Sequence, residues 1–165
     1  MVVSVSVSLK LEQMKTRGLF PGSFDPFTKG HEAVVRKSLT LFDEVVIGVG
    51  INSKKQYLFD LEKRIEHIQF LFQDEPRVRI ERFQSLTVNF CKEINAGFII
   101  RGLRDSKDFQ YEKSIAHMNF SISEIETVFF LTDQAYSAIN SSIIREIHQN
   151  GGPIDAFVTH PEMLV

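Results

Sequence analysis

Residues 17–31 read RGLFPGSFDPFTKGH, in which a short apolar run leads through a loop rich in glycine and proline into the start of a helix. The apolar run at 18–20 predicts a strand, and the helix is expected to begin near His31. Glycine lets the loop backbone approach a ligand closely, Ser23 offers a hydroxyl, and the N–H groups at the start of a helix favour an anion. A turn-rich crossover is the plain alternative for such a loop taken alone.

The alternation of short apolar runs with longer amphipathic stretches continues along the chain. This pattern is typical of parallel strands joined by crossover helices, and we predict an α/β fold with a five-stranded parallel sheet. The predicted strands are residues 18–20, 44–49, 78–82, 98–101 and 126–131. The helices are predicted to begin near His31, Leu61, Thr87 and Lys107, with a last helix from about residue 141 to 148 that ends at Asn150, Gly151 and Gly152. Asp60 is expected to cap the helix that begins at Leu61.

Composition limits the classes of partner. A chain of 165 residues, 43% of them hydrophobic, suits one domain, and a formal net charge of −2 gives no bulk attraction to nucleic acid or to anionic membranes. No apolar run approaches the length of a bilayer span and no secretory leader is apparent, so we expect a cytoplasmic protein with neither nucleic acid nor membrane as a partner. The single cysteine, Cys91, excludes an internal disulfide and is expected to be a buried structural thiol.

The first thirteen residues differ from the rest. Residues 3–9 read VSVSVSL and alternate with period two, as an edge strand would, but no turn residues join them to the next segment of the chain. We expect residues 1–13 to be an N-terminal extension, either disordered or part of a wrongly assigned start. Met14 is then the natural first residue, and the domain spans residues 14–165.

Three later segments also follow predicted strands, at the sheet edge where ligands bind in open parallel sheets. Residues 52–57 contain the adjacent Lys54 and Lys55, which by themselves indicate a solvated charge pair. RGLR at residues 101–104 offers arginines suited to bidentate contact with phosphate, although a surface turn paired with Asp105 and Asp108 is the alternative. Residues 140–142, Asn-Ser-Ser, form a helix cap that can also bind phosphate. Their convergence with the first loop on one sheet edge predicts a phosphate-binding site.

Two segments resemble the signatures of the nucleotidyltransferase superfamily. TKGH at residues 28–31 is similar to the first signature, T/H-x-G-H, and INSSIIR at residues 139–145 is similar to the second, I-S-S-T-x-x-R. Further segments resemble the bacterial phosphopantetheine adenylyltransferase family in order and spacing, and the resemblance covers residues 17–162. These segments are PGSFDP at 21–26, RGLR at 101–104, DFQYE at 108–112 and AHMN at 116–119.

The resemblance implies a single-domain, Rossmann-like dinucleotide-binding fold and a homohexamer. The implied reaction uses ATP with Mg²⁺ and transfers AMP to 4′-phosphopantetheine, giving dephospho-coenzyme A and pyrophosphate. A phosphate monoester has a second pKa near 6 and is largely dianionic at neutral pH, so the acceptor needs no general base. The protein must supply alignment and positive groups. Mg²⁺ would be held mainly by the phosphates and water, and no protein metal site is predicted.

The resemblance also implies roles for individual residues. The implied catalytic residues are His31, which stabilises the transition state, and Lys55, which stands four residues before Phe59 as the family pattern requires; Lys54 is the fallback. The implied ATP-binding residues are Ser23, Phe24, His31, Gly102, Leu103, Arg104, Glu112, Tyr136, Ser137, Ala138, Ile139, Asn140, Ser141 and Ser142. The implied acceptor-binding residues are Ser23, Lys55, Thr87 and Arg101. Asn140 replaces a serine of the family signature, which keeps a capping group but removes a hydroxyl.

Two other functions are consistent with parts of this pattern. The T-x-G-H loop does not choose the acceptor, so the chain could adenylylate or cytidylylate another phosphorylated molecule; the RGLR block argues against this. A non-catalytic module that binds nucleotide or coenzyme A could keep the same fold, because fold alone does not establish chemistry. The presence of both His31 and Lys55 argues against that module.

Overall fold

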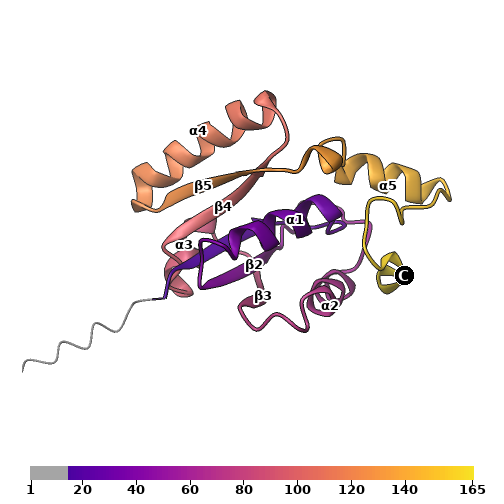
Figure 1. Ribbon diagram of the computed structural model, residues 1–165, viewed down its shortest axis with the longest axis horizontal. Helices are drawn as coiled ribbons and strands as arrows, with labels where there is room; N and C mark the ends of the chain where they lie inside the picture. Colours follow the sequence, from indigo (N-terminus) through magenta and orange to yellow (C-terminus); the bar gives the residue numbers. More distant parts are fainter. Residues whose placement is uncertain (1–14) are drawn as a thin grey trace, which may run out of the picture.

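The computed structural model describes residues 15–165, which form one five-stranded parallel sheet in the order β3-β2-β1-β4-β5, with helices on both faces (Figure 1). The strands are β1 (Arg17–Gly22), β2 (Glu44–Gly50), β3 (Val78–Phe83), β4 (Phe98–Leu103) and β5 (Glu126–Leu131). The helices are α1 (Lys29–Ser38), α2 (Leu61–Leu71), α3 (Thr87–Glu93), α4 (Ser106–Ser123) and α5 (Ser141–Gln149), with 3-10 turns at Gln134–Tyr136 and Pro161–Leu164. The predicted α/β class and all five predicted strands are confirmed. The predictions for residues 1–13 and for Met14 lie outside the described residues.

The centre of the sheet is buried on both faces. In β2, Val45, Val46, Ile47 and Val49 have no exposed surface, which explains why this strand is a nearly continuous apolar run without polar alternation. Helices α1 and α2 pack on one face of the sheet. Helix α3 packs on the other face, where it contacts Leu19 of β1 and Val46 of β2. The result is a three-layer arrangement in which helices cover the central strands on both faces.

The order of the strands reverses between β1 and β4. β1 pairs with β2 at six positions, but with β4 at only two, Gly18 with Phe98 and Leu19 with Ile99. Beyond those positions the two neighbouring strands are not paired, and space opens between their carboxyl ends. Such a switch in strand order is where open α/β sheets bind ligands.

The helix ends agree with the sequence predictions at all but one position. Asn140 caps α5 by accepting hydrogen bonds from Ser142 N and Ile143 N, and the chain leaves α5 through Gly151 at a φ of 77°. Cys91 is fully buried, and burial raises the pKa of its thiol to about 11, as expected of a structural thiol.

The prediction that Asp60 caps α2 is wrong. Its exposed side chain makes no capping bond, because the open start of this helix lets water satisfy both the carboxylate and the N–H groups.

A third apolar cluster joins the end of the chain to the sheet edge. Phe59, just before α2, packs with Ile144 of α5 and with Ile154, Val158 and Leu164 of the last segment. This cluster holds α5 close to the loop between β2 and α2. Within residues 15–165, no helix is long and apolar enough to cross a membrane.

Candidate active site

Two adjoining cavities lie at the carboxyl edge of the sheet, where β1 and β4 separate. The first has a volume of about 430 Å³ and the second about 340 Å³. The residues that line both cavities are Pro21, Gly22, Ser23, Lys55, Arg101 and Glu112. Two ligands, one in each cavity, would therefore meet at the same few side chains.

Most residues implied by the family resemblance lie at these cavities. The first cavity is lined by Ser23, Phe24, His31, Lys55, Arg101, Gly102, Arg104, Glu112, Tyr136, Ile139, Asn140, Ser141 and Ser142. Thr87 lines the second cavity. Leu103, Ser137, Ala138 and the fallback Lys54 line neither. The geometry therefore favours Lys55 over Lys54.

His31 is positioned by the helix that it begins. Thr28 caps α1 and forms a reciprocal capping box, in which Thr28 Oγ1 accepts from His31 N and His31 Nδ1 accepts from Thr28 N at 3.0 Å. Because Nδ1 accepts this bond, the ring proton of the neutral imidazole is on Nε2. Burial, reinforced by the positive charges of Arg101 and Arg104, lowers the pKa of His31 to about 3. His31 is thus a neutral hydrogen-bond donor at neutral pH.

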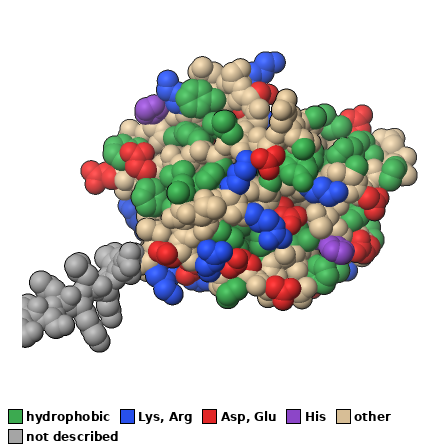
Figure 2. Space-filling view, viewed as in Figure 1, with side chains coloured by type: hydrophobic (Ala, Val, Ile, Leu, Met, Phe, Trp, Pro, Cys, Tyr) green, Lys and Arg blue, Asp and Glu red, His purple; other side chains and the backbone are tan. Residues whose placement is uncertain are grey.

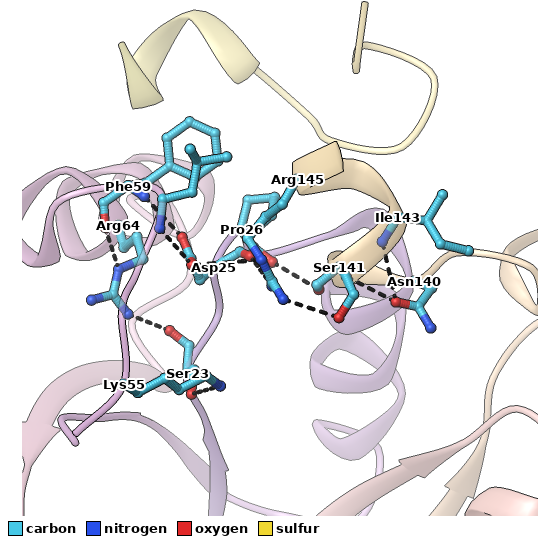
Figure 3. Close-up of polar contacts among 12 residues, drawn as sticks. Ser23, Asp25, Pro26, Lys55, Phe59, Arg64, Asn140, Ser141, Ile143 and Arg145 are labelled. Carbon is cyan, nitrogen blue, oxygen red and sulfur yellow. Dashed lines mark hydrogen bonds and ion pairs between the residues drawn. The ribbon is translucent and has the colours of Figure 1, made fainter. Parts of the chain in front are cut away.

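Lys55 and Ser23 meet between the two cavities. Lys55 belongs to the loop between β2 and α2, and Ser23 comes directly after β1; Lys55 Nζ donates to Ser23 Oγ at 3.2 Å (Figure 3). The ammonium group is exposed to solvent and can bind an anion without breaking a buried ion pair. Phe24, the next residue, has a φ of 49°, a left-handed conformation uncommon outside glycine that is typical of constrained functional loops.

Both arginines of the RGLR block already have carboxylate partners. Arg101 donates through Nε to Glu112 at 2.9 Å and through Nη2 to the same carboxylate, and its Nη1 donates to Pro21 O at 2.7 Å. Arg104 pairs with Asp108, with its Nε 2.9 Å from Oδ2, as the surface-turn alternative expected. Asp105 instead caps α4. A bound phosphate must share these guanidinium donors with the carboxylates.

Two residues without a predicted role connect the loops of the site. Asp25 is 2% exposed, and its carboxylate accepts from Leu58 N at 2.9 Å and from Phe59 N at 3.0 Å. Arg145 Nη1 donates to Asp25 O at 2.7 Å, and its Nη2 donates to the hydroxyl of Ser142 at 3.0 Å. Both residues lie inside the quoted signatures, but only the fold shows that they join segments more than thirty residues apart.

Within the described residues, 15–165, no group of three or more His, Cys, Asp or Glu side chains is arranged to hold a metal ion. The polar groups at the first cavity are hydroxyls, three guanidinium groups, the Lys55 ammonium group, an amide and one imidazole, together with the carboxylates of Asp25, Asp108 and Glu112, each of which lies near an arginine. These groups suit a phosphate chain, together with any cation that the phosphates carry.

Comparisons with known proteins identify the family. The cytidylyltransferase-like family model matches residues 19–147. A phosphopantetheine adenylyltransferase from Flavobacterium psychrophilum is 46% identical over 142 residues, covering 86% of this chain and 94% of the relative. The chain belongs to the phosphopantetheine adenylyltransferase family. Relatives of the same name from Bacteroides fragilis (44% identical, 86% of this chain and 95% of the relative) and Lachnoclostridium phytofermentans (48%, 86% and 87%) agree.

Solved structures support the fold of this phosphopantetheine adenylyltransferase family member. A putative nicotinate-nucleotide adenylyltransferase from Vibrio parahaemolyticus aligns with a TM-score of 0.67 at 20% identity, over 92% of each chain. A bifunctional NMN adenylyltransferase/ADP ribose pyrophosphatase from Francisella tularensis, complexed with AMP and a manganese ion, aligns with a TM-score of 0.65 at 21% identity, over 90% of this chain and 46% of that one. The predicted Rossmann-like fold and the nucleotidyltransferase family are confirmed.

The cap of α5 generates a first prediction. Asn140→Ser keeps a capping oxygen, so it should leave the free energy of unfolding nearly unchanged and alter kcat by no more than about threefold. Asn140→Ala removes the cap and should lower the free energy of unfolding by about 1 kcal/mol. Urea denaturation and steady-state pyrophosphate release measure the two effects. A large gain in activity on Asn140→Ser would show that the asparagine impairs the site.

Proposed function

We propose that this chain, as a pantetheine-phosphate adenylyltransferase, transfers AMP reversibly from ATP to 4′-phosphopantetheine through the two adjoining cavities, in coenzyme A biosynthesis. The products are dephospho-coenzyme A and pyrophosphate. The observation that carries this proposal is the wall that the cavities share, where Ser23, Lys55 and Arg101 can contact two ligands at once. Adenylyl transfer requires the acceptor phosphate and the α-phosphate of ATP to meet at such a place.

We assign ATP to the first cavity. Its walls include the start of α5, where Ser141 and Ser142 bring hydroxyl groups and the helix dipole favours an anion, together with Arg104 and His31. The second cavity suits the acceptor arm, because Phe83, Ile99 and Ile115 offer apolar surface while Thr87 and Asn119 offer hydrogen bonds. This mixture fits a flexible chain that contains amide groups.

The chemistry needs no general base. The dianionic acceptor phosphate attacks the α-phosphorus of ATP, a P–O bond forms, and the bond to the departing pyrophosphate breaks. The neutral His31 donates its Nε2–H to an α-phosphate oxygen as negative charge grows there, while Lys55 holds the acceptor phosphate in line. Mg²⁺, when bound, would be held mainly by the phosphates and water and would supply further charge neutralisation.

We propose that the protein is a homohexamer in the cytoplasm, and the exposed apolar surface of the chain supports self-association. Apolar side chains are exposed over α4 and β5, in the upper part of the face shown in Figure 2. The exposed apolar residues of α4 and β5 include Tyr111 (68% exposed), Met118 (70%), Ile122 (63%) and Leu131 (74%). Because β5 is also an edge strand, this face would expose an aggregation-prone surface unless another copy covered it. The buried free thiol of Cys91 fits a reducing compartment.

The proposed assembly predicts six chains per particle in sedimentation equilibrium. Met118→Glu places a charge on the exposed face of α4 and should shift the distribution toward smaller species. Gln69→Glu, on the exposed surface of α2, which contacts β3 at the opposite edge of the sheet from β5, is the control and should leave the mass unchanged. A parent protein that sediments as a monomer at micromolar concentration would contradict the assembly but not the reaction.

The acceptor is tested by pyrophosphate release with ATP, Mg²⁺ and one of three acceptors: 4′-phosphopantetheine, nicotinate mononucleotide or glycerol 3-phosphate. We expect kcat/KM to be at least about 100-fold higher with 4′-phosphopantetheine, because the phosphate contacts are common to all three and only the second cavity discriminates. Chelation of divalent cations should abolish turnover, and Mg²⁺ should restore it. Comparable kcat/KM with nicotinate mononucleotide would overturn the acceptor assignment. Binding of ATP without turnover of any acceptor would indicate a non-catalytic module.

The role of His31 is tested by His31→Ala. The variant should lose about 10²–10³ in kcat, because the donor acts chiefly on charge that develops in the transition state. The Kd of ATP, measured by calorimetry, should change much less. His160→Ala, an exposed histidine outside both cavities, is the control and should keep the parent kcat. A kcat for His31→Ala within two- or threefold of the parent would remove His31 from the mechanism.

A further inference from the structure

Arg64 is a buried cation that the mechanism above does not use. It lies in the first half of α2, yet only 2% of its surface is exposed, and this burial lowers its pKa. Removing a guanidinium from water is costly unless its N–H groups are bonded. Here the Nε donates to Phe59 O at 3.0 Å and the Nη1 donates to Ser23 O at 2.5 Å. The cost of burial is therefore offset by contacts with the loops of the site.

The third contact of Arg64 is aromatic. Its Cζ lies 4.2 Å from the centroid of the Tyr57 ring, a close cation–π contact. The hydroxyl of Tyr57 accepts from Asn52 N at 2.9 Å and lies 3.5 Å from Gly50 O. Tyr57 follows the exposed part of the β2–α2 loop, so its side chain ties the end of that part back to its beginning. Residues 52–56 are all exposed and have few other internal bonds to hold them.

These contacts converge on the pair formed by Lys55 and Ser23. The Lys55 Nζ lies 5.7 Å from the centroid of the Tyr57 ring and donates to the Ser23 hydroxyl. Arg64 holds the ring on one side of this pair and the Ser23 carbonyl on the other, as the dashed contacts of Figure 3 show for Ser23. One rigid, planar group thus sets the separation between the loop after β1 and the loop after β2.

We propose that Arg64 is a positioning residue for the reaction: it places the ammonium group of Lys55 where the acceptor phosphate binds. The inference rests on the proposed function. An apolar side chain could fill the same space without the cost of burying a charge, but it could not donate to Ser23 O and Phe59 O. All three contacts of the guanidinium are with residues of the two loops that carry Ser23 and Lys55, or with Phe59 at the end of the second loop. Lysine cannot substitute fully, since it lacks the fork that contacts two carbonyls and stacks on a ring.

The experiment compares Arg64→Lys with the parent, using ATP, Mg²⁺ and 4′-phosphopantetheine. We expect the acceptor KM to rise about tenfold and kcat to fall severalfold, because an ammonium group cannot donate to Ser23 O and Phe59 O and stack on Tyr57 at the same time. The Kd of ATP should change less than threefold, since Arg104 and the start of α5 are not held by Arg64. Tyr57→Phe is a milder second variant: it keeps the ring over Arg64, loses the bond from Asn52 N, and should raise the acceptor KM in the same direction.

The matched control is His67→Gln on the same helix. His67 is also fully buried, but it contacts Thr159 O at 2.6 Å, away from both cavities. A loss of stability without a change in acceptor KM is expected for this variant. A rise in acceptor KM equal to that of Arg64→Lys would show that general destabilisation, and not positioning, explains the effect.

A double-mutant cycle with Lys55→Ala gives the sharpest readout. If Arg64 acts through Lys55, Arg64→Lys should change the acceptor KM little further in the Lys55→Ala background; independent, additive effects would overturn the inference. An acceptor KM within twofold of the parent in both folded Arg64→Lys and Tyr57→Phe would overturn it as well. A parent without turnover of 4′-phosphopantetheine would instead refute the proposed function, so the two failures are distinguishable.

Discussion

The site depends on the early separation of β1 from β4. The two strands share only two paired positions, whereas the other neighbouring strands continue in register to the sheet edge. Pro21, on the part of β1 that is not paired with β4, has no N–H to donate, and its carbonyl accepts from the Arg101 side chain. Arg101 therefore spans the opening between the two strands, and its side chain lines both cavities. The loops after β1, β2 and β4 surround the same opening.

Irregular backbone at such an opening needs bonds that a sheet would otherwise supply. Asp25 accepts two N–H groups of the β2–α2 loop, Arg64 donates to two carbonyls, and Arg145 ties the loop after β1 to α5. These side chains are long or charged, and each spans a distance that backbone groups alone cannot. A rigid shell of this kind holds the exposed Lys55 and the half-buried Ser23 in place, so that little entropy is lost on binding, as alignment for in-line attack requires.

The two arginines of the site already have carboxylate partners before a ligand arrives. Arg101 pairs with Glu112 and Arg104 with Asp108, and burial, reinforced by the positive field of the two arginines, keeps His31 neutral. An incoming phosphate chain brings the negative charge that these groups lack, and it can draw the guanidinium donors away from the carboxylates. The family resemblance assigned Glu112 to ATP and Arg101 to the acceptor. The structure places the two in one ion pair on the wall between the cavities, so each substrate can affect the other through that pair.

Strand positions, the cap at Asn140 and the two signature loops follow from the sequence alone, because hydrophobic period, capping chemistry and motif spacing are local properties. The expected cap at Asp60 was wrong, since whether a side chain caps a helix depends on its rotamer and on access of water, which the pattern does not contain. Only the tertiary structure decided which nitrogen of His31 carries the proton, that Arg101 pairs with Glu112, and that Arg64 and Asp25 are buried between loops. The burial and pairing of these charged side chains arise where segments distant in the chain come into contact, and neither composition nor motif spacing predicts those contacts.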